Sequence, residues 1–229
     1  MFDENSLNSS SISSDMYDLM SKLYPICRSI TGNGVRETLS IINDIINLKI
    51  SDIPTGTQVY DWKIPKEWNI SDAYVLDPNG HKIIDFKISN LHIVNYSIPV
   101  NGIFSLNELK KHLHSNPKQP DLIPYLTSYY NDDWGFCLSH KQFENLQEGN
   151  YTVVIDSTLK DGSLTYGEYF KQGTSNDEFL ISCYICHPSM CNDNLSGIVI
   201  STYLAKLLSK IQTTYSYRFL FIPETIGAI

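Results

Sequence analysis

The 229-residue sequence is poor in positive charge and has no basic cluster. Its 17 Lys and Arg residues stand against 25 Asp and Glu residues, which gives a formal net charge of −8. The densest basic spot is the pair Lys110 and Lys111. Because nucleic-acid binding needs clustered basic side chains that neutralise phosphates, this composition argues against a nucleic-acid partner.

Long apolar runs and a leader peptide are also missing. No apolar stretch approaches the roughly 20 residues that span a bilayer, and the polar, Ser- and Asn-rich segment 1–15 has neither a cationic start nor an apolar core. The five cysteines are an odd number at irregular spacing, which fits reduced thiols better than a disulfide framework. These absences predict a cytoplasmic protein without a membrane partner.

What is present predicts a folded core, since 42% of the residues are hydrophobic and only 18% are charged. Residues 1–12 are expected to form a disordered tail, and residues 13–52 two helices, because their apolar residues recur at three- and four-residue steps. Residues 53–149 carry short β-branched and aromatic runs separated by turn signals, which predicts a β-rich subdomain. Residues 150–229 return to an α/β rhythm. The predicted fold class is α/β with an inserted β-rich subdomain.

Several local elements follow from turn and capping signals. The turn Asp77–Gly80 predicts a hairpin, the run Leu91–Ser97 a strand, and Ser105–His114 a short helix capped by its first residue. The segments 151–156 and 163–170 are expected to pair with each other through a tight turn.

The last block reads as a β-α-β unit. Segments 178–187 and 217–223 are nearly continuous apolar runs, typical of strands buried on both faces, and 196–210 is helical by length and apolar face. The two strands should therefore be parallel. Side chains alternate along a strand, so Cys186 and His187 are expected to face apart rather than act as a pair.

Three polar residues lie at the carboxyl ends of these two strands. His187 ends the first strand, Asp193 follows in the loop, and Glu224 comes just after the second strand. Open α/β sheets bind ligands beyond those strand ends, and N and O donors suit zinc. Each residue also has a structural alternative: a hydrogen-bonding His, an Asp that caps a helix, and a solvated Glu.

The sequence stops at Ile229, just past a buried strand, with no following helix or polar exit. A sheet that ended there would leave a strand edge exposed. The chain is therefore expected to be an N-terminal fragment that is inactive alone. A catalytic zinc has three protein ligands besides any base, so further ligands are expected after Ile229.

The residues of two motifs resemble those of a known protein family. The strings ICHPSMCNDNLSG (185–197) and FLFIPETIG (219–227) closely resemble a bacterial family of aminopeptidase-like proteins linked to surface-polysaccharide biosynthesis clusters. Upstream strings extend the resemblance to nearly everything after Asp15: DWKIPKEW (61–68), NYSIP (95–99), IPYLTSYY (123–130), WGFC (134–137) and IDSTL (155–159). The resemblance implies a peptidase domain with an inserted β-rich block, distantly similar to co-catalytic zinc aminopeptidases.

That resemblance implies roles for the three residues. His187 matches the first metal-binding His, Asp193 the metal-bridging Asp, and Glu224 the first carboxylate of a Glu-Glu pair, which is the general base. Ser189 stands where an Asp would complete a His-X-Asp pattern, and Thr225 replaces the second Glu. Two questions therefore stay open: whether the site holds one zinc ion or two, and whether Glu224 is the base or a ligand.

The implied function is a zinc-dependent, aminopeptidase-like hydrolase that cleaves a peptide or amide bond next to a free amine. Two alternatives stay open. One is an amide hydrolase or acyl transferase acting on amino sugars in polysaccharide assembly. The other is a non-catalytic binding module that kept the fold. The expected partner is a small peptide or amide substrate, and self-association into a homo-oligomer is left open.

Overall fold

A computed structural model of the chain describes residues 9–228. The chain divides into two compact units, each of which is considered by itself. The first unit contains residues 9–53, 58–62 and 164–228, and the second contains residues 54–57 and 63–163.

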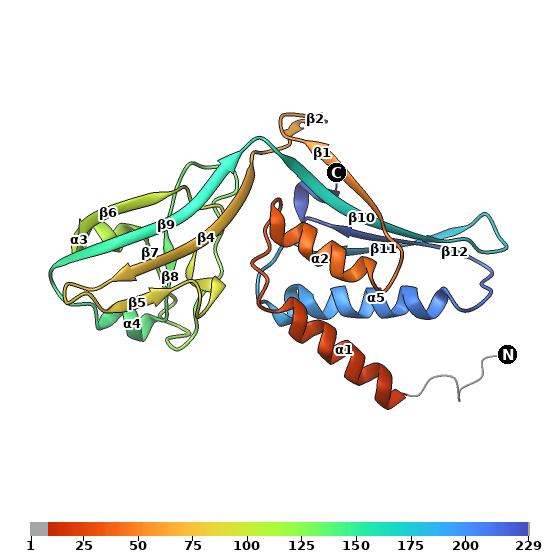
Figure 1. Ribbon diagram of the computed structural model, residues 1–229, viewed down its shortest axis with the longest axis horizontal. Coiled ribbons are helices and arrows are strands. Elements are labelled where there is room, and N and C mark those ends of the chain that lie inside the picture. The colour runs from red at the N-terminus through yellow and green to blue at the C-terminus, as the bar shows by residue number, and fades with distance from the viewer. Residues whose placement is uncertain (1–8, 229) are drawn as a thin grey trace. The chain divides into compact units, whose positions relative to one another are not determined.

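The first unit is built on a four-stranded mixed sheet in the order β1-β10-β12-β11 (Figure 1). Its strands are β1 (Lys49–Pro54), β10 (Ser163–Lys171), β11 (Glu178–Tyr184) and β12 (Ser216–Ile222). β12 pairs antiparallel with β10 and parallel with β11. Helix α5 (Ser196–Leu208) connects the parallel pair, which confirms the predicted β-α-β unit.

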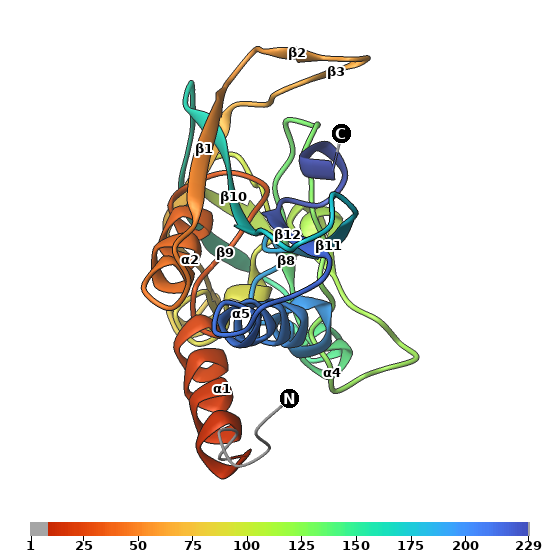
Figure 2. The ribbon, with the colours of Figure 1, turned by 90° about the vertical axis from the view of Figure 1, so that its right-hand side faces the viewer.

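Three helices flank one face of this sheet (Figures 1 and 2). They are α1 (Ser9–Leu23), α2 (Asn33–Asn43) and α5. Their apolar sides close over Phe219 and Phe221 of β12, which are fully buried in the core of the unit. Burying a side chain of this size stabilises the fold by roughly 1.5–3 kcal/mol. This packing holds the carboxyl ends of β11 and β12 in place.

The N-terminal boundary differs from the expected one. Helix α1 begins at Ser9, so residues 9–12 are helical rather than part of a tail. Residues 1–8 of the expected tail lie outside the described residues. Across residues 9–228, no helix has the length and apolar character needed to cross a membrane.

The second unit is built on an antiparallel sheet in the order β5-β4-β9-β6. Its strands are β4 (Glu67–Leu76), β5 (Lys82–Asp85), β6 (Val100–Ser105) and β9 (Asn150–Lys160). The hairpin predicted at Asp77–Gly80 joins β4 to β5, with the Asp77 carboxylate accepting main-chain bonds from Asn79 and His81. The predicted β-rich subdomain is present as this unit.

The shorter elements are β2 (Gln58–Val59), β3 (Trp62–Lys63), η2 (Asn90–His92), α3 (Leu106–Leu109), η3 (Lys110–His112), β7 (Leu113–His114), β8 (Phe136–Cys137), α4 (His140–Glu144), η4 (Cys191–Leu195) and η5 (Thr225–Ala228).

Ser105 caps α3 through a reciprocal pair of bonds with Glu108, as predicted. The helical stretch is shorter than expected because β7 pairs with β8.

The strand predicted at Leu91–Ser97 is wrong. A 3-10 turn forms at Asn90–His92, and the residues that follow make only isolated bridges. Tyr96 adopts a φ of 71°, and the hydroxyl of Ser97 donates to the Val94 carbonyl at 2.6 Å. The left-handed residue and this local bond interrupt the extended backbone that a strand needs.

The pairing predicted between segments 151–156 and 163–170 is also wrong. β9 is flanked by β4 on one side and β6 on the other, so both of its edges are already bonded. β10 instead pairs with β12 in the other sheet. The chain therefore passes from one unit to the other after β9, and the second unit extends to Ser163 instead of ending at residue 149.

Candidate metal centre

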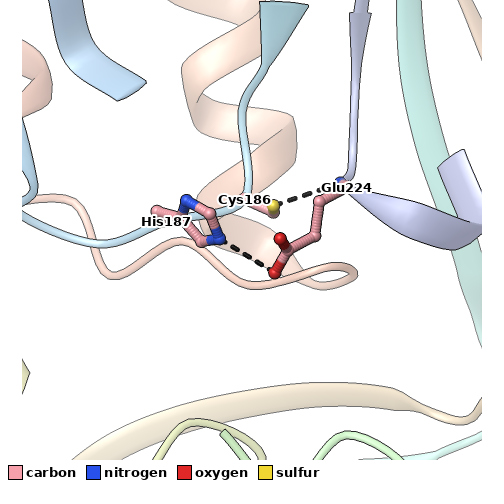
Figure 3. A group of neighbouring side chains, drawn as sticks. All are labelled: Cys186, His187 and Glu224. Carbon is pink, nitrogen blue, oxygen red and sulfur yellow. Dashed lines mark hydrogen bonds and ion pairs between the residues drawn. The ribbon is translucent and has the colours of Figure 1, made fainter. Parts of the chain in front are cut away.

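The carboxyl ends of the parallel strands bring three side chains together (Figure 3). β11 ends at Tyr184, and one further main-chain bond, from Ile185 N to Ile222 O at 2.9 Å, carries the pairing with β12 one residue past the end of β11. Cys186 and His187 then leave the strand, while Glu224 follows the end of β12. The geometry of parallel strands thus places these side chains at one edge of the sheet.

His187 lies between two carboxylates. Its Nε2 atom is 2.8 Å from Glu224 Oε1, and its Nδ1 atom is 3.2 Å from Asp193 Oδ1. The imidazole is 6% exposed, whereas the side chains of Glu224 and Asp193 are 28% and 60% exposed. The structure brings the three predicted residues together, but the carboxylates approach opposite nitrogens of the ring. Asp193 and Glu224 therefore do not converge on one side of the imidazole.

Cys186 is a neighbour that the sequence argument missed. Strand alternation predicted that Cys186 and His187 would face apart, and this prediction is wrong because β11 ends before both residues. The donor atoms of Cys186, His187 and Glu224 all lie within 4.8 Å of one another. The main-chain N–H of Glu224 also donates to the Cys186 sulfur at 3.2 Å. The sequence signal was Pro188, which marks the end of extended pairing two residues after Cys186.

The electrostatics of the cluster favour a charged imidazole in the absence of metal. Burial by itself lowers the pKa of His187, but hydrogen bonding and negative charge from Cys186 and Glu224 outweigh burial and raise that pKa to about 10. A cation is therefore stabilised at this position. The same negative groups would stabilise a metal ion in place of the proton.

The guanidinium of Arg28 fixes the backbone under the site. Arg28 is fully buried, and it donates from Nε to the His187 carbonyl at 3.0 Å and from Nη1 to the Leu23 carbonyl at 2.6 Å. Burial lowers the pKa of Arg28 to about 10, against an opposing effect of Cys27 and Cys186. These bonds tie the end of α1 to the backbone that carries the imidazole.

The loop before α5 aims Asp193 at His187. The neighbouring Asn194, not Asp193, accepts the bond from the Gly197 main-chain N–H at 3.1 Å. The N-cap position of α5 is Leu195, without a side-chain cap bond, so the helix-capping alternative for Asp193 does not describe this loop. A Cβ atom at position 197 would lie 2.0 Å from Asn194 Oδ1, so a larger residue there would displace the Asn194 side chain.

Ser189, the first departure from the pattern of the zinc aminopeptidases, forms a hydrogen bond to the main chain. Its hydroxyl donates to the Tyr24 carbonyl at 2.7 Å, and its backbone adopts a φ of 43°. The Ser189 side chain is thus bound to the residue that follows α1. The side chain of Thr225, the second departure, lies outside the described part of the structure.

Comparison with known proteins places this fold. The model of the family described as a domain of unknown function, DUF4910, matches residues 17–229. The chain belongs to this family. A relative from Clostridium acetobutylicum, described as a polysaccharide biosynthesis protein with an aminopeptidase-like domain, is 57% identical over 222 residues, which are 97% of this chain and 51% of the relative. The chain thus spans about half the length of this relative.

Solved structures show the same architecture. A peptidase structure from Clostridium acetobutylicum matches with a TM-score of 0.94 and 56% identity, over 96% of this chain and 52% of that one. A zinc aminopeptidase from Bacillus subtilis matches with a TM-score of 0.54 and 12% identity, over 91% of this chain and 61% of that one. At that identity the second likeness shows the fold alone. This DUF4910 chain therefore has an aminopeptidase-like fold.

The donor set fits a metal ion. Imidazole nitrogen, carboxylate oxygen and thiol sulfur are the ligands that proteins offer to zinc, a borderline-soft ion. Their separation of at most 4.8 Å allows one ion to lie among them after small side-chain movements. The buried imidazole and its strand-end position match the general location of ligand sites in α/β proteins.

Proposed function

We propose that this protein is a metal-dependent, aminopeptidase-like hydrolase that cleaves a peptide or amide bond next to a free amine. The proposal rests on one observation: the contact between His187 Nε2 and Glu224 Oε1, at 2.8 Å, lies at the carboxyl edge of parallel strands in an aminopeptidase-like fold. Zinc bound there would polarise the scissile carbonyl and lower the pKa of its water to about 7.

His187 is the central ligand in this proposal. Its Nε2 atom lies 2.8 Å from Glu224 Oε1, and a metal would bind both atoms there. Asp193 takes a different role from the one that the family resemblance implied. Its carboxylate lies 3.2 Å from the other ring nitrogen, on the side of the imidazole away from Glu224, which is where carboxylates that orient metal-bound histidines commonly lie.

Glu224 is a ligand rather than a separate base in this arrangement. A single variant separates the two roles. Glu224→Gln is expected to lose both hydrolysis and bound metal, because the neutral amide replaces the anionic ligand. A base that only moves protons would leave the metal in place while the rate fell about 10²- to 10⁴-fold. Metal content measured beside kcat distinguishes these outcomes.

The first experiment measures metal and activity in the full-length protein. We expect stoichiometric zinc by elemental analysis and hydrolysis of aminoacyl 4-nitroanilides. A chelator should remove both the zinc and the activity, and added zinc should restore the rate. Unchanged hydrolysis by fully metal-free protein would overturn the proposal.

A second substrate class is supported by the name of the Clostridium acetobutylicum relative, which couples an aminopeptidase-like domain to polysaccharide biosynthesis. In this alternative the same centre would act on an amide of an amino sugar. Parallel assays of aminoacyl anilides and N-acylated amino sugars would choose between the classes. A full-length protein that binds no metal and hydrolyses neither would instead be a binding module.

A further inference from the structure

We propose that Cys186 is a ligand of the metal, so that sulfur, nitrogen and oxygen from Cys186, His187 and Glu224 hold one ion. This inference rests on the proposed function, because it assigns a ligand to the same centre. It departs from the ligand set expected from sequence, in which Asp193 was a ligand and Cys186 was not.

The count of ligands leads to Cys186. A catalytic zinc has three protein ligands and keeps one position open for water. Asp193 lies against Nδ1 of the imidazole, while Glu224 lies against Nε2. An ion at Nε2 would therefore lie beside His187 and Glu224. The Cys186 sulfur is there, within 4.8 Å of both donor atoms (Figure 3).

The surroundings of the sulfur suit a metal-bound thiolate. Cys186 is fully buried, yet the Glu224 main-chain N–H points at its sulfur from 3.2 Å. A charge-assisted bond of this kind stabilises the anionic form of an acceptor. Thiolate is the form that binds metal, so this bond favours the ligand.

The backbone explains how consecutive residues reach one ion. Cys186 and His187 stand after the last residue of β11, where alternation of side chains no longer applies. Arg28 holds the His187 carbonyl and Ile222 holds the Ile185 N–H. The two-residue segment is thus fixed at both ends, and its side chains turn toward Glu224 together.

The test uses Co²⁺ alone as the probe on metal-free, full-length protein. Wild type should show a thiolate-to-Co²⁺ charge-transfer absorption in the near ultraviolet together with visible bands of a low-coordinate site. Cys186→Ser should lose the charge-transfer absorption. Two matched controls should keep it: Cys183→Ser, a buried thiol on β11, and Cys191→Ser, an exposed thiol in the nearby loop.

A second measurement identifies the ligand atoms directly. X-ray absorption of the zinc-loaded wild type should show one sulfur at about 2.3 Å beside nitrogen and oxygen at about 2.0–2.2 Å. Asp193→Asn should keep this sulfur shell and weaken zinc binding by about 10- to 100-fold, the loss typical of an outer-shell partner. A change of the first shell in Asp193→Asn would contradict the assignment.

The two proposals fail separately. Metal that binds with only nitrogen and oxygen neighbours, in a protein that hydrolyses its substrate, would overturn the Cys186 assignment and leave the proposed function intact. A charge-transfer absorption that persists in Cys186→Ser would do the same. Absence of metal binding by wild type would overturn both.

Discussion

Two buried histidines, one in each unit, show opposite behaviour. His187 in the first unit and His92 in the second are both 6% exposed. The Nδ1 atom of His92 lies 2.7 Å from the Cys137 carbonyl, which only accepts and so requires a proton on that nitrogen. Burial lowers the pKa of His92 against the smaller opposing effects of Cys137 and Asp85, whereas the pKa of His187 is raised to about 10.

The difference shows that partners, rather than burial, decide what a buried polar group can do. In the second unit, buried donors bond to main-chain carbonyls: Trp68 Nε1 and the Ser157 hydroxyl both donate to Ser97 O, at 2.9 and 2.8 Å. These hydrogen bonds join uncharged donors to an uncharged carbonyl, and such bonds between buried polar groups stabilise the fold. Around His187 the partners are ionisable side chains, and a charge there is stabilised.

The largest effect should come from replacing each of these two histidines by alanine and measuring metal content and activity. His187→Ala removes the central ligand, so we expect loss of stoichiometric zinc and a fall in kcat/KM beyond the roughly 100-fold typical of an outer-shell change. His92→Ala is the matched control and should keep metal and rate at temperatures where it stays folded. Equal losses in both variants would break the comparison.

A large change in stability should follow from Trp68→Ala. Trp68 is almost fully buried in the second unit, and its ring stacks on Tyr96 at 5.8 Å between centroids. We expect a loss of about 3–5 kcal/mol in the free energy of unfolding, measured by urea denaturation. Trp68→Phe keeps an aromatic ring and should cost less: about 1 kcal/mol for the lost bond, since Ser157 still donates to Ser97 O, together with the smaller cavity that the missing atoms leave.

A smaller loss should follow from Arg28→Met, which preserves the apolar stem and removes the guanidinium. The carbonyls of His187 and Leu23 would lose a donor, at about 1–3 kcal/mol for each group left unsatisfied. Urea denaturation measures this loss, and zinc affinity should fall as well because the backbone at His187 loosens. Unchanged stability and affinity would show that Arg28 does not hold this segment.

The smallest expected effect is a pH dependence from His92. Its pKa in the folded protein is lowered, while the unfolded value is about 6.5. The unfolded state thus binds a proton first, and this residue's contribution to stability is present above pH 6.5 and is lost as pH falls below it. His92→Gln should flatten that part of the difference in unfolding free energy from wild type between pH 8 and pH 5. An unchanged slope would mean that His92 titrates normally.

Local signals in the sequence were sufficient for the parts of the fold that local physics controls. The apolar runs at β11 and β12, with a helix between them, predicted a parallel pair, and Ser105 predicted a capped helix. Both are present. Capping and apolar periodicity act over a few residues, so a single sequence contains them.

Long-range choices could not be read in this way. Segment 151–156 matches a strand wherever it pairs, and only the neighbouring β4 and β6 edges determine that β9 joins their sheet. At the site, His187, Asp193 and Glu224 were found from their positions relative to strand ends. The nearness of Cys186 was missed, because it depends on β11 ending at Tyr184 rather than at His187.

The graded exposure of the centre has a kinetic consequence. Asp193 is 60% exposed, Glu224 28% and His187 6%, so an incoming cation meets the most solvated carboxylate first. Interactions with an exposed charge are screened by salt, and buried ones much less. The uptake rate of metal should therefore slow as ionic strength rises, while its residence time, set by the buried nitrogen, should change little.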